Sequence, residues 1–134
     1  MATITLGLIM SPQFQQSFTR LLGQSHLPLR TSFKLRKIAQ QLRGHVRQYE
    51  EGQRQLLERS AARTEDGAIR REYSEQHQQD MTVLAPEQVE RYTQELTALA
   101  ATQVQIDELN EADLGDRFDL SPQDIIALEF ITED

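Results

Sequence analysis

Three histidines are the only side chains here that could act as strong nitrogen ligands or as general bases near neutral pH: His26, His45 and His77. None of them falls in a helical metal-binding pattern, and the chain has no cysteine to supply a thiolate ligand or nucleophile. A glycine-rich phosphate loop, a Gly-x-Ser-x-Gly elbow and a Ser-x-x-Lys pair are also missing from the sequence. We therefore predict a protein that is not an enzyme and that has no catalytic residue, cofactor or resident metal.

An acidic run near the C-terminus supplies the carboxylates that calcium or magnesium would use. Its members are Asp107, Glu108, Glu111, Asp113, Asp116 and Asp119. Their spacing does not match a calcium loop, because no glycine follows an alternating set of acids. The run is typical of a solvated acidic loop, or of an acidic surface that meets a basic patch on this chain or on a partner.

A row of arginines is the clearest candidate for binding. Arg36, Arg43, Arg47 and Arg54 are spaced by seven, four and seven residues, which places them on one side of a helix that could follow a phosphate backbone. Three glutamates, at positions 50, 51 and 58, lie close enough along the helix to pair with part of this row. The net charge of −7 and the lack of interleaved aromatic residues argue against nucleic acid. Neutralisation by the acidic C-terminal half, or by an acidic protein partner, is favoured.

The last apolar segment is the second candidate for an interaction element. Ile125, Ile126, Leu128 and Phe130 form a cluster too apolar to stand in water. It is expected either to dock on the protein's own core or to bind a partner.

The elements that carry these residues follow from periodicity and from helix start signals. They are a strand at 2–9, a helix from Ser11-Pro12 to about Gly23, a long helix at 30–62, a helix at 86–101, a strand at 102–106 and a short terminal helix from Ser121-Pro122. An Asp-Gly turn lies within 64–67, and residues 68–85 are expected to form a polar loop or the two arms of a hairpin. The two strands are expected to pair with each other.

The predicted fold class is mainly α with a small antiparallel β element (α+β). A long antiparallel helical hairpin at about 30–101 is joined to a short terminal helix, within a single domain over 1–134 that ends in an acidic segment at 107–134. Gly44 and Gly52 are unfavourable inside the long helix, so each is expected to have a neighbour packed close to it or to mark a bend.

Charge is sorted along the chain. Residues 1–63 carry ten Lys/Arg against three Asp/Glu, and residues 64–134 carry four against eighteen, giving +7 and −14. Such polarity suits pairing within the monomer, or contacts between copies in a homo-oligomer.

The order of three stretches resembles that of small proteins of unknown function encoded by tailed phages and prophages. These are Leu27–Leu35 at the start of the long helix, Glu65–Gly67 at its end, and Leu120–Glu129 near the C-terminus. Residues 69–79 depart from that layout, being more polar and rich in glutamine. The resemblance implies no catalytic residues.

From these observations we expect a non-enzymatic phage structural or assembly protein that binds other phage proteins. The alternative is an early phage protein that binds a host enzyme complex, such as RNA polymerase or a nuclease, through its acidic surface; a second alternative is a basic-helix nucleic-acid binder. The expected location is the host cytoplasm or the virion. No membrane partner is expected, because the apolar stretch Ala2–Met10 is too short to span a bilayer and has no signal-peptide pattern.

Overall fold

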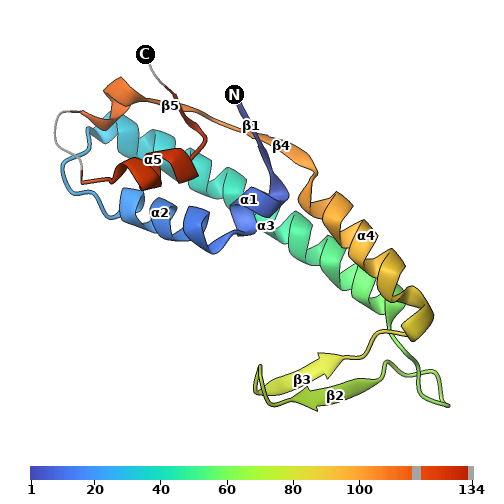
Figure 1. Cartoon of the computed structure of the whole chain (residues 1–134). Helices are drawn as coiled ribbons and strands as arrows, with labels where there is room; N and C mark the ends of the chain where they lie inside the picture. Colours follow the sequence, from blue (N-terminus) through green and yellow to red (C-terminus); the bar gives the residue numbers. More distant parts are fainter. Residues whose placement is uncertain (116–118, 133–134) are drawn as a thin grey trace. The chain divides into compact units, whose positions relative to one another are not determined.

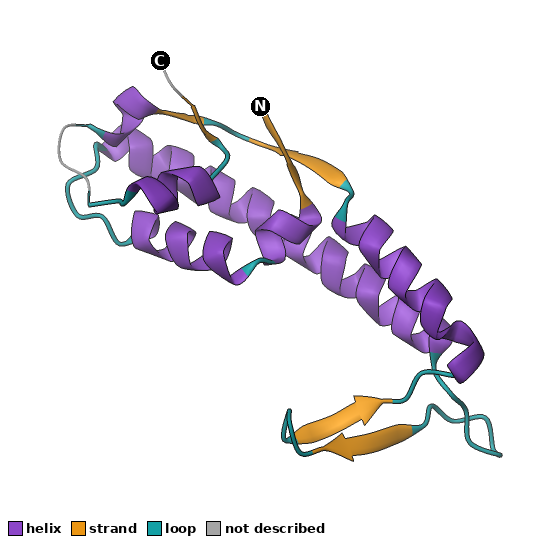
Figure 2. Ribbon diagram, viewed as in Figure 1, coloured by secondary structure: helices purple, strands orange, loops and turns teal. Residues whose placement is uncertain are grey.

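The computed structural model describes residues 1–115 and 119–132, and the chain forms two compact units. The first comprises residues 1–48 and 100–134, and the second comprises residues 49–99 (Figure 1). Most of the described residues are helical and the sheets are small, which confirms the predicted mainly α composition (Figure 2). The single domain expected from the chain length stays a prediction.

The first unit contains short elements gathered around the first half of one long helix. Its elements are β1 (Ala2–Thr5), α1 (Leu6–Met10), α2 (Pro12–Leu22), the start of α3 (Leu29–Ser60), β4 (Gln103–Ile106), β5 (Leu109–Asn110), the 3-10 helix η2 (Glu111–Leu114), α5 (Pro122–Ala127) and β6 (Ile131–Thr132). Strand β1 pairs antiparallel with β4, as predicted, with Ala2 opposite Ile106. Strands β5 and β6 form a short parallel pair that the sequence pattern did not indicate.

The predicted strand at 2–9 is wrong beyond residue 5. The hydroxyl of Thr5 accepts a hydrogen bond from the backbone N–H of Leu8 at 3.1 Å, so Thr5 caps the short helix α1. The side chains of Leu6 and Ile9 on this helix are buried. Gly7 lies against Ala100, where an added Cβ would stand 3.0 Å from the Ala100 carbonyl oxygen. The alternation of apolar and polar residues therefore continues past residue 5, where the backbone changes from strand to helix, and only the Thr5 cap marks that change.

The helix starts at Ser11-Pro12 and Ser121-Pro122 are both confirmed. Ser11 accepts from the N–H of Phe14 at 3.3 Å and Ser121 accepts from that of Asp124 at 3.2 Å, each with proline in the first turn. However, α5 ends at Ala127, so Leu128 and Phe130 lie beyond the terminal helix in which they were expected.

The core of the first unit is aliphatic apart from two phenylalanines. Its fully or almost fully buried members are Ile4, Leu6, Ile9, Phe14, Leu21, Leu35, Ile38, Leu42, Ile106, Leu109, Leu114, Leu128 and Phe130. The core residues of α3 recur at spacings of three and four, as the periodicity predicted, so one side of its first half is buried.

In the second unit, the end of α3 packs against α4 (Val89–Ala100), which follows the 3-10 helix η1 (Pro86–Gln88). Gly52 lies against Leu99, and Arg59 forms an ion pair with Glu95 at 3.6 Å. Since the later residue of α3 meets the earlier residue of α4, the two helices are antiparallel here. The long helical pair is therefore formed by the second half of α3 alone.

The two interior glycines of α3 have different surroundings. A Cβ on Gly52 would lie 2.9 Å from Cδ2 of Leu99, so the close neighbour expected at this position is confirmed. A Cβ on Gly44 would meet nothing within 4 Å, and α3 continues through this position as a single helix. Of the two alternatives expected at Gly44, the close neighbour is therefore wrong, and the bend stays a prediction.

Residues 68–85 form the hairpin that was one of the two predicted alternatives. Its strands are β2 (Arg71–Ser74) and β3 (Gln79–Thr82), paired antiparallel. The preceding Asp-Gly turn is confirmed, with Gly67 at φ +85°.

At the base of the hairpin three chain segments meet in a closed triangle of backbone hydrogen bonds. Arg70 donates to Ala62 at 2.8 Å, Ala62 donates to Val83 at 2.7 Å, and Val83 donates to Arg70 at 3.0 Å. Each segment thus donates a backbone hydrogen bond to a carbonyl group of another, so these polar groups are paired.

Candidate functional site

Helix α3 carries two rows of cations in the first unit, and the first row is neutralised by carboxylates of this chain. Asp113 is 3% exposed and receives Lys34 Nζ at 3.0 and 3.1 Å on its two carboxylate oxygens. Arg30 Nη2 lies 3.5 Å from the same carboxylate, and Lys37 Nζ lies 3.0 Å from Asp107. The basic helix and the acidic segment therefore pair within one chain at these positions.

Asp113 is also held by backbone groups. Its carboxylate accepts the N–H of Asn110 at 2.9 Å in a capping box, and its own carbonyl accepts the hydroxyl proton of the fully buried Thr31. Burial pushes the pKa of Asp113 upward, but the hydrogen bonds from Asn110 and Lys34 and the charges of Lys34 and Arg30 outweigh it. The net effect is to lower the pKa of this carboxyl.

Asp107 sits in a comparable arrangement beside the same row. Gln41 donates its side-chain amide to the Asp107 carboxylate at 3.3 Å and accepts the Asp107 backbone N–H at 2.8 Å. The hydrogen bond from Lys37 lowers the pKa of Asp107 despite an opposing effect of desolvation. His45 contacts the carbonyl of Gln105 at 3.2 Å, so this histidine also joins α3 to the strand that precedes the acidic segment.

The second row consists of Arg36, Arg43 and Arg47, which are all exposed. At 100° per residue these three positions lie within about 40° of one another, on the side of α3 away from Leu35 and Leu42. Among the residues that the structure describes, none of the three has an ion pair or a hydrogen bond to a side chain. Three guanidinium groups on one face thus have no charged partner within the described part of the chain.

Arg54, the fourth member predicted from the spacing, lies in the second unit and is paired. Its guanidinium binds Glu51 and Glu58, the latter at 2.5 Å. These ion pairs raise the pKa of Arg54 and lower that of Glu51. The expectation that glutamates would neutralise part of the row is confirmed at this residue.

Two exposed apolar side chains continue the second row toward the start of α3. Leu29 is 72% exposed and Phe33 is 61% exposed. They precede Arg36 by seven and three residues, so they share its side of the helix. Leu29, Phe33, Arg36, Arg43 and Arg47 are called the α3 stripe below. Sequence reasoning missed Leu29 and Phe33, although this spacing could have found them.

The terminal apolar cluster is divided between core and surface. Leu128 and Phe130 are fully buried, and the Phe130 ring packs edge-on against Phe14 and Phe18 at centroid distances of 6.2 and 6.0 Å. They are core residues, and docking on the protein's own core accounts for them. Ile125 is half-buried, while Ile126 is 75% exposed.

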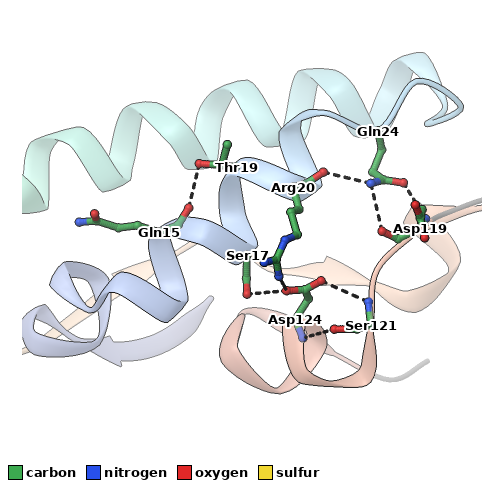
Figure 3. A network of polar contacts seen from close by, with 8 residues as sticks. All are labelled: Gln15, Ser17, Thr19, Arg20, Gln24, Asp119, Ser121 and Asp124. Carbon is green, nitrogen blue, oxygen red and sulfur yellow. Dashed lines mark hydrogen bonds and ion pairs between the residues drawn. The ribbon is translucent and has the colours of Figure 1, made fainter.

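A polar network joins α5 to α2 (Figure 3). The buried carboxylate of Asp124 accepts the Ser17 hydroxyl at 2.8 Å, Arg20 Nη1 at 2.5 Å and the Ser121 backbone N–H at 3.2 Å. The bond from Ser17 lowers the pKa of Asp124 most strongly. Gln24 extends the network by accepting the backbone N–H of Asp119 at 2.6 Å. These contacts join α5 to α2, so the network acts as a structural anchor.

Within residues 1–115 and 119–132, no three His, Asp or Glu side chains lie close enough together to hold a metal ion. One acid of the predicted run, Asp116, lies outside the described residues. No described helix combines the length and the apolar character needed to cross a bilayer. No protein-family model, no curated protein and no solved structure matches the chain.

Proposed function

We propose that this chain is a non-enzymatic assembly protein of a phage particle and that its α3 stripe binds an acidic surface on another phage protein. The observation that carries the proposal is the free second row. The carboxylates of the acidic segment pair with Arg30, Lys34 and Lys37, and Arg36, Arg43 and Arg47 are left without partners among the described residues.

The composition of the α3 stripe favours a protein partner over nucleic acid. Phe33 and Leu29 add exposed apolar area beside the guanidinium groups, and interfaces between proteins are enriched in arginine and aromatic residues. Binding of a phosphate backbone would use lysines and arginines on both rows. The lysines of the first row are already paired with carboxylates, which argues against nucleic acid. The stripe extends along α3 for about 27 Å, at the helical rise per residue.

Carboxylates are the partner groups that the α3 stripe fits best. A guanidinium group donates two parallel hydrogen bonds to one carboxylate, a geometry that lysine cannot reproduce. An acidic helix or loop with an apolar flank would pair with the arginines and cover Phe33. The resemblance of the sequence layout to small tailed-phage proteins supports a place in a phage particle.

The test measures binding of the purified chain to the structural proteins encoded beside its gene. One variant carries Arg36→Glu, Arg43→Glu and Arg47→Glu, and the matched variant replaces the same three residues by lysine. The wild type is expected to bind one partner stoichiometrically. The glutamate variant is expected to lose binding, and the lysine variant is expected to weaken it because the paired hydrogen bonds are lost.

Three results would count against the proposal. Recovery of a single host enzyme complex instead of phage proteins would favour a host-directed regulator. Binding to duplex DNA at low salt, equal for arginine and lysine, would favour a nucleic-acid binder. A protein that is absent from purified virions and stays a monomer with every phage protein tested is not an assembly component.

A further inference from the structure

Strand β2 has an outer edge that nothing in the described chain covers. The side chains of Arg71, Glu72 and Tyr73 are all exposed, with Tyr73 at 63%. On the other strand Met81 is 39% exposed. Both faces of the hairpin thus meet solvent, and a two-stranded hairpin with neither a third strand nor a covering helix is marginally stable in water.

The hydrogen-bond pattern between β2 and β3 determines which N–H and C=O groups of β2 point toward this outer edge. Val83 N–H donates to the carbonyl of Arg70, so these two residues form a bonded position of the antiparallel ladder. Bonded and non-bonded positions alternate, so Arg71 opposite Thr82 and Tyr73 opposite Asp80 are non-bonded. The backbone groups of Arg71 and Tyr73 therefore point away from β3. Another strand can pair with them.

We propose that this edge binds the same edge of a second copy, with β2 antiparallel to β2 about a two-fold axis at Tyr73. Outward-pointing residues must face outward-pointing residues, so odd-numbered positions pair with odd-numbered positions. Centring the axis on Tyr73 places the two Tyr73 side chains opposite each other. It also places Arg71 of each copy opposite Glu75 of the other.

The side chains on this edge complement themselves in that register. Neither Arg71 nor Glu75 has an ion pair among the described residues, whereas their neighbours Arg70 and Glu72 bind each other at 2.8 Å. The two-fold pairing gives both free charges an opposite partner, twice, around an aromatic pair; each kind of cross-strand pair is favourable. Moving the axis to residue 72 or 74 places Tyr73 opposite Arg71 or Glu75 and loses this match.

Two hairpins joined in this way form one four-stranded sheet in place of two marginally stable two-stranded hairpins. The free edge is short, because β2 spans only Arg71–Ser74 and Glu75 is the first residue of the turn that follows. The contact therefore covers residues 71–75 of each copy. It does not depend on the partner of the α3 stripe, so the two proposals fail separately.

Charge reversal tests the register through self-association measured by sedimentation over a concentration series. The wild type is expected to form a dimer. In Arg71→Glu each pair becomes Glu against Glu, and in Glu75→Arg each becomes Arg against Arg, so either variant alone is expected to raise the dimer dissociation constant about tenfold. An equal mixture of the two variants restores opposite charges at both pairs and is expected to dimerise like the wild type.

Cysteine cross-linking provides a second measurement, since the chain has no cysteine of its own. Tyr73→Cys is expected to form an intermolecular disulfide under mild oxidation, because opposite residues bring their Cα atoms within disulfide range. The matched control is Thr82→Cys, on the same face of the same hairpin but about 20 Å from its copy, three strand spacings across and four residues along the strands. It is expected to cross-link far more slowly.

The proposal is overturned by any of three results: a wild type that remains monomeric across the series, single variants that associate as strongly as the wild type, or equal cross-linking rates at positions 73 and 82. A mixture that fails to associate, where the wild type does, also excludes the register.

Discussion

Gly44→Ala and Gly52→Ala place the same methyl group at two interior positions of α3 that have opposite surroundings. Nothing lies within 4 Å of a Cβ built on Gly44. The substitution therefore adds only helix propensity, and we expect it to stabilise the fold by about 1 kcal/mol. It serves as the internal reference for the second position.

At Gly52 the same gain is opposed by a collision. The new Cβ would lie 2.9 Å from Cδ2 and 3.2 Å from Cδ1 of Leu99, so the leucine must leave its position. An off-rotamer side chain costs about 0.5–1.5 kcal/mol and overpacking costs about 1–3 kcal/mol. We expect Gly52→Ala to range from neutral to about 2 kcal/mol destabilising.

A double-mutant cycle with Leu99→Ala isolates the contact. Once Leu99 is shortened, Gly52→Ala should recover the gain of about 1 kcal/mol seen at Gly44, so the two sites should couple by about 1–3 kcal/mol. Denaturant unfolding followed by circular dichroism measures these free energies. For a chain of this size, 1 kcal/mol also corresponds to about 3–5 °C in Tm.

The reasoning is refuted if Gly52→Ala stabilises the protein as much as Gly44→Ala and the effect is unchanged by Leu99→Ala. That outcome means that α4 does not pack on α3 at this position.

Three further predictions concern the first unit. Ser121→Ala removes the cap of α5 and should lower the free energy of unfolding by about 1 kcal/mol in denaturant titrations. Leu128→Ala should cost about 2–5 kcal/mol in the same assay because it empties a buried position, whereas Ile126→Ala, at an exposed one, should change stability by less than about 0.5 kcal/mol. The pKa of Asp113 is lower in the folded protein than in the unfolded chain, so the folded state binds fewer protons in acid and loses stability as the pH falls below about 4. Asp113→Asn should reduce this loss in unfolding measured as a function of pH, and an identical pH dependence for the two proteins would contradict the assignment.

Local signals in the sequence predicted the helix starts and the hairpin turn. In a Ser-Pro pair the serine hydroxyl caps the helix and the proline ring suits its first turn. The helix starts at residues 11 and 121 could therefore be predicted without tertiary information. The end of β1 was different. Period-two alternation continues through Leu6, and only the hydroxyl of Thr5 folding back onto Leu8 shows that a helix has begun.

The candidate site divides in the same way. The partners of Arg54 are three and four residues away on its own helix, so its neutralisation could be predicted from spacing. Lys34 and Asp113 are 79 residues apart, and no periodicity relates them. For that reason the sequence could not distinguish the neutralised row of α3 from the free one. Similarly, Ile126 and Phe130 are equally apolar, and only packing separates surface from core.

The triangle of backbone bonds among Ala62, Arg70 and Val83 makes the β2–β3 arm a separable insert between two helices. The chain leaves α3 and returns toward α4 through the same three-way closure, so both ends of the arm are fixed at one place. Residues added to or removed from the two strands in matched pairs would keep the ladder in phase and leave this closure intact. The reach of the arm can therefore change in evolution or by design independently of the helices that carry it.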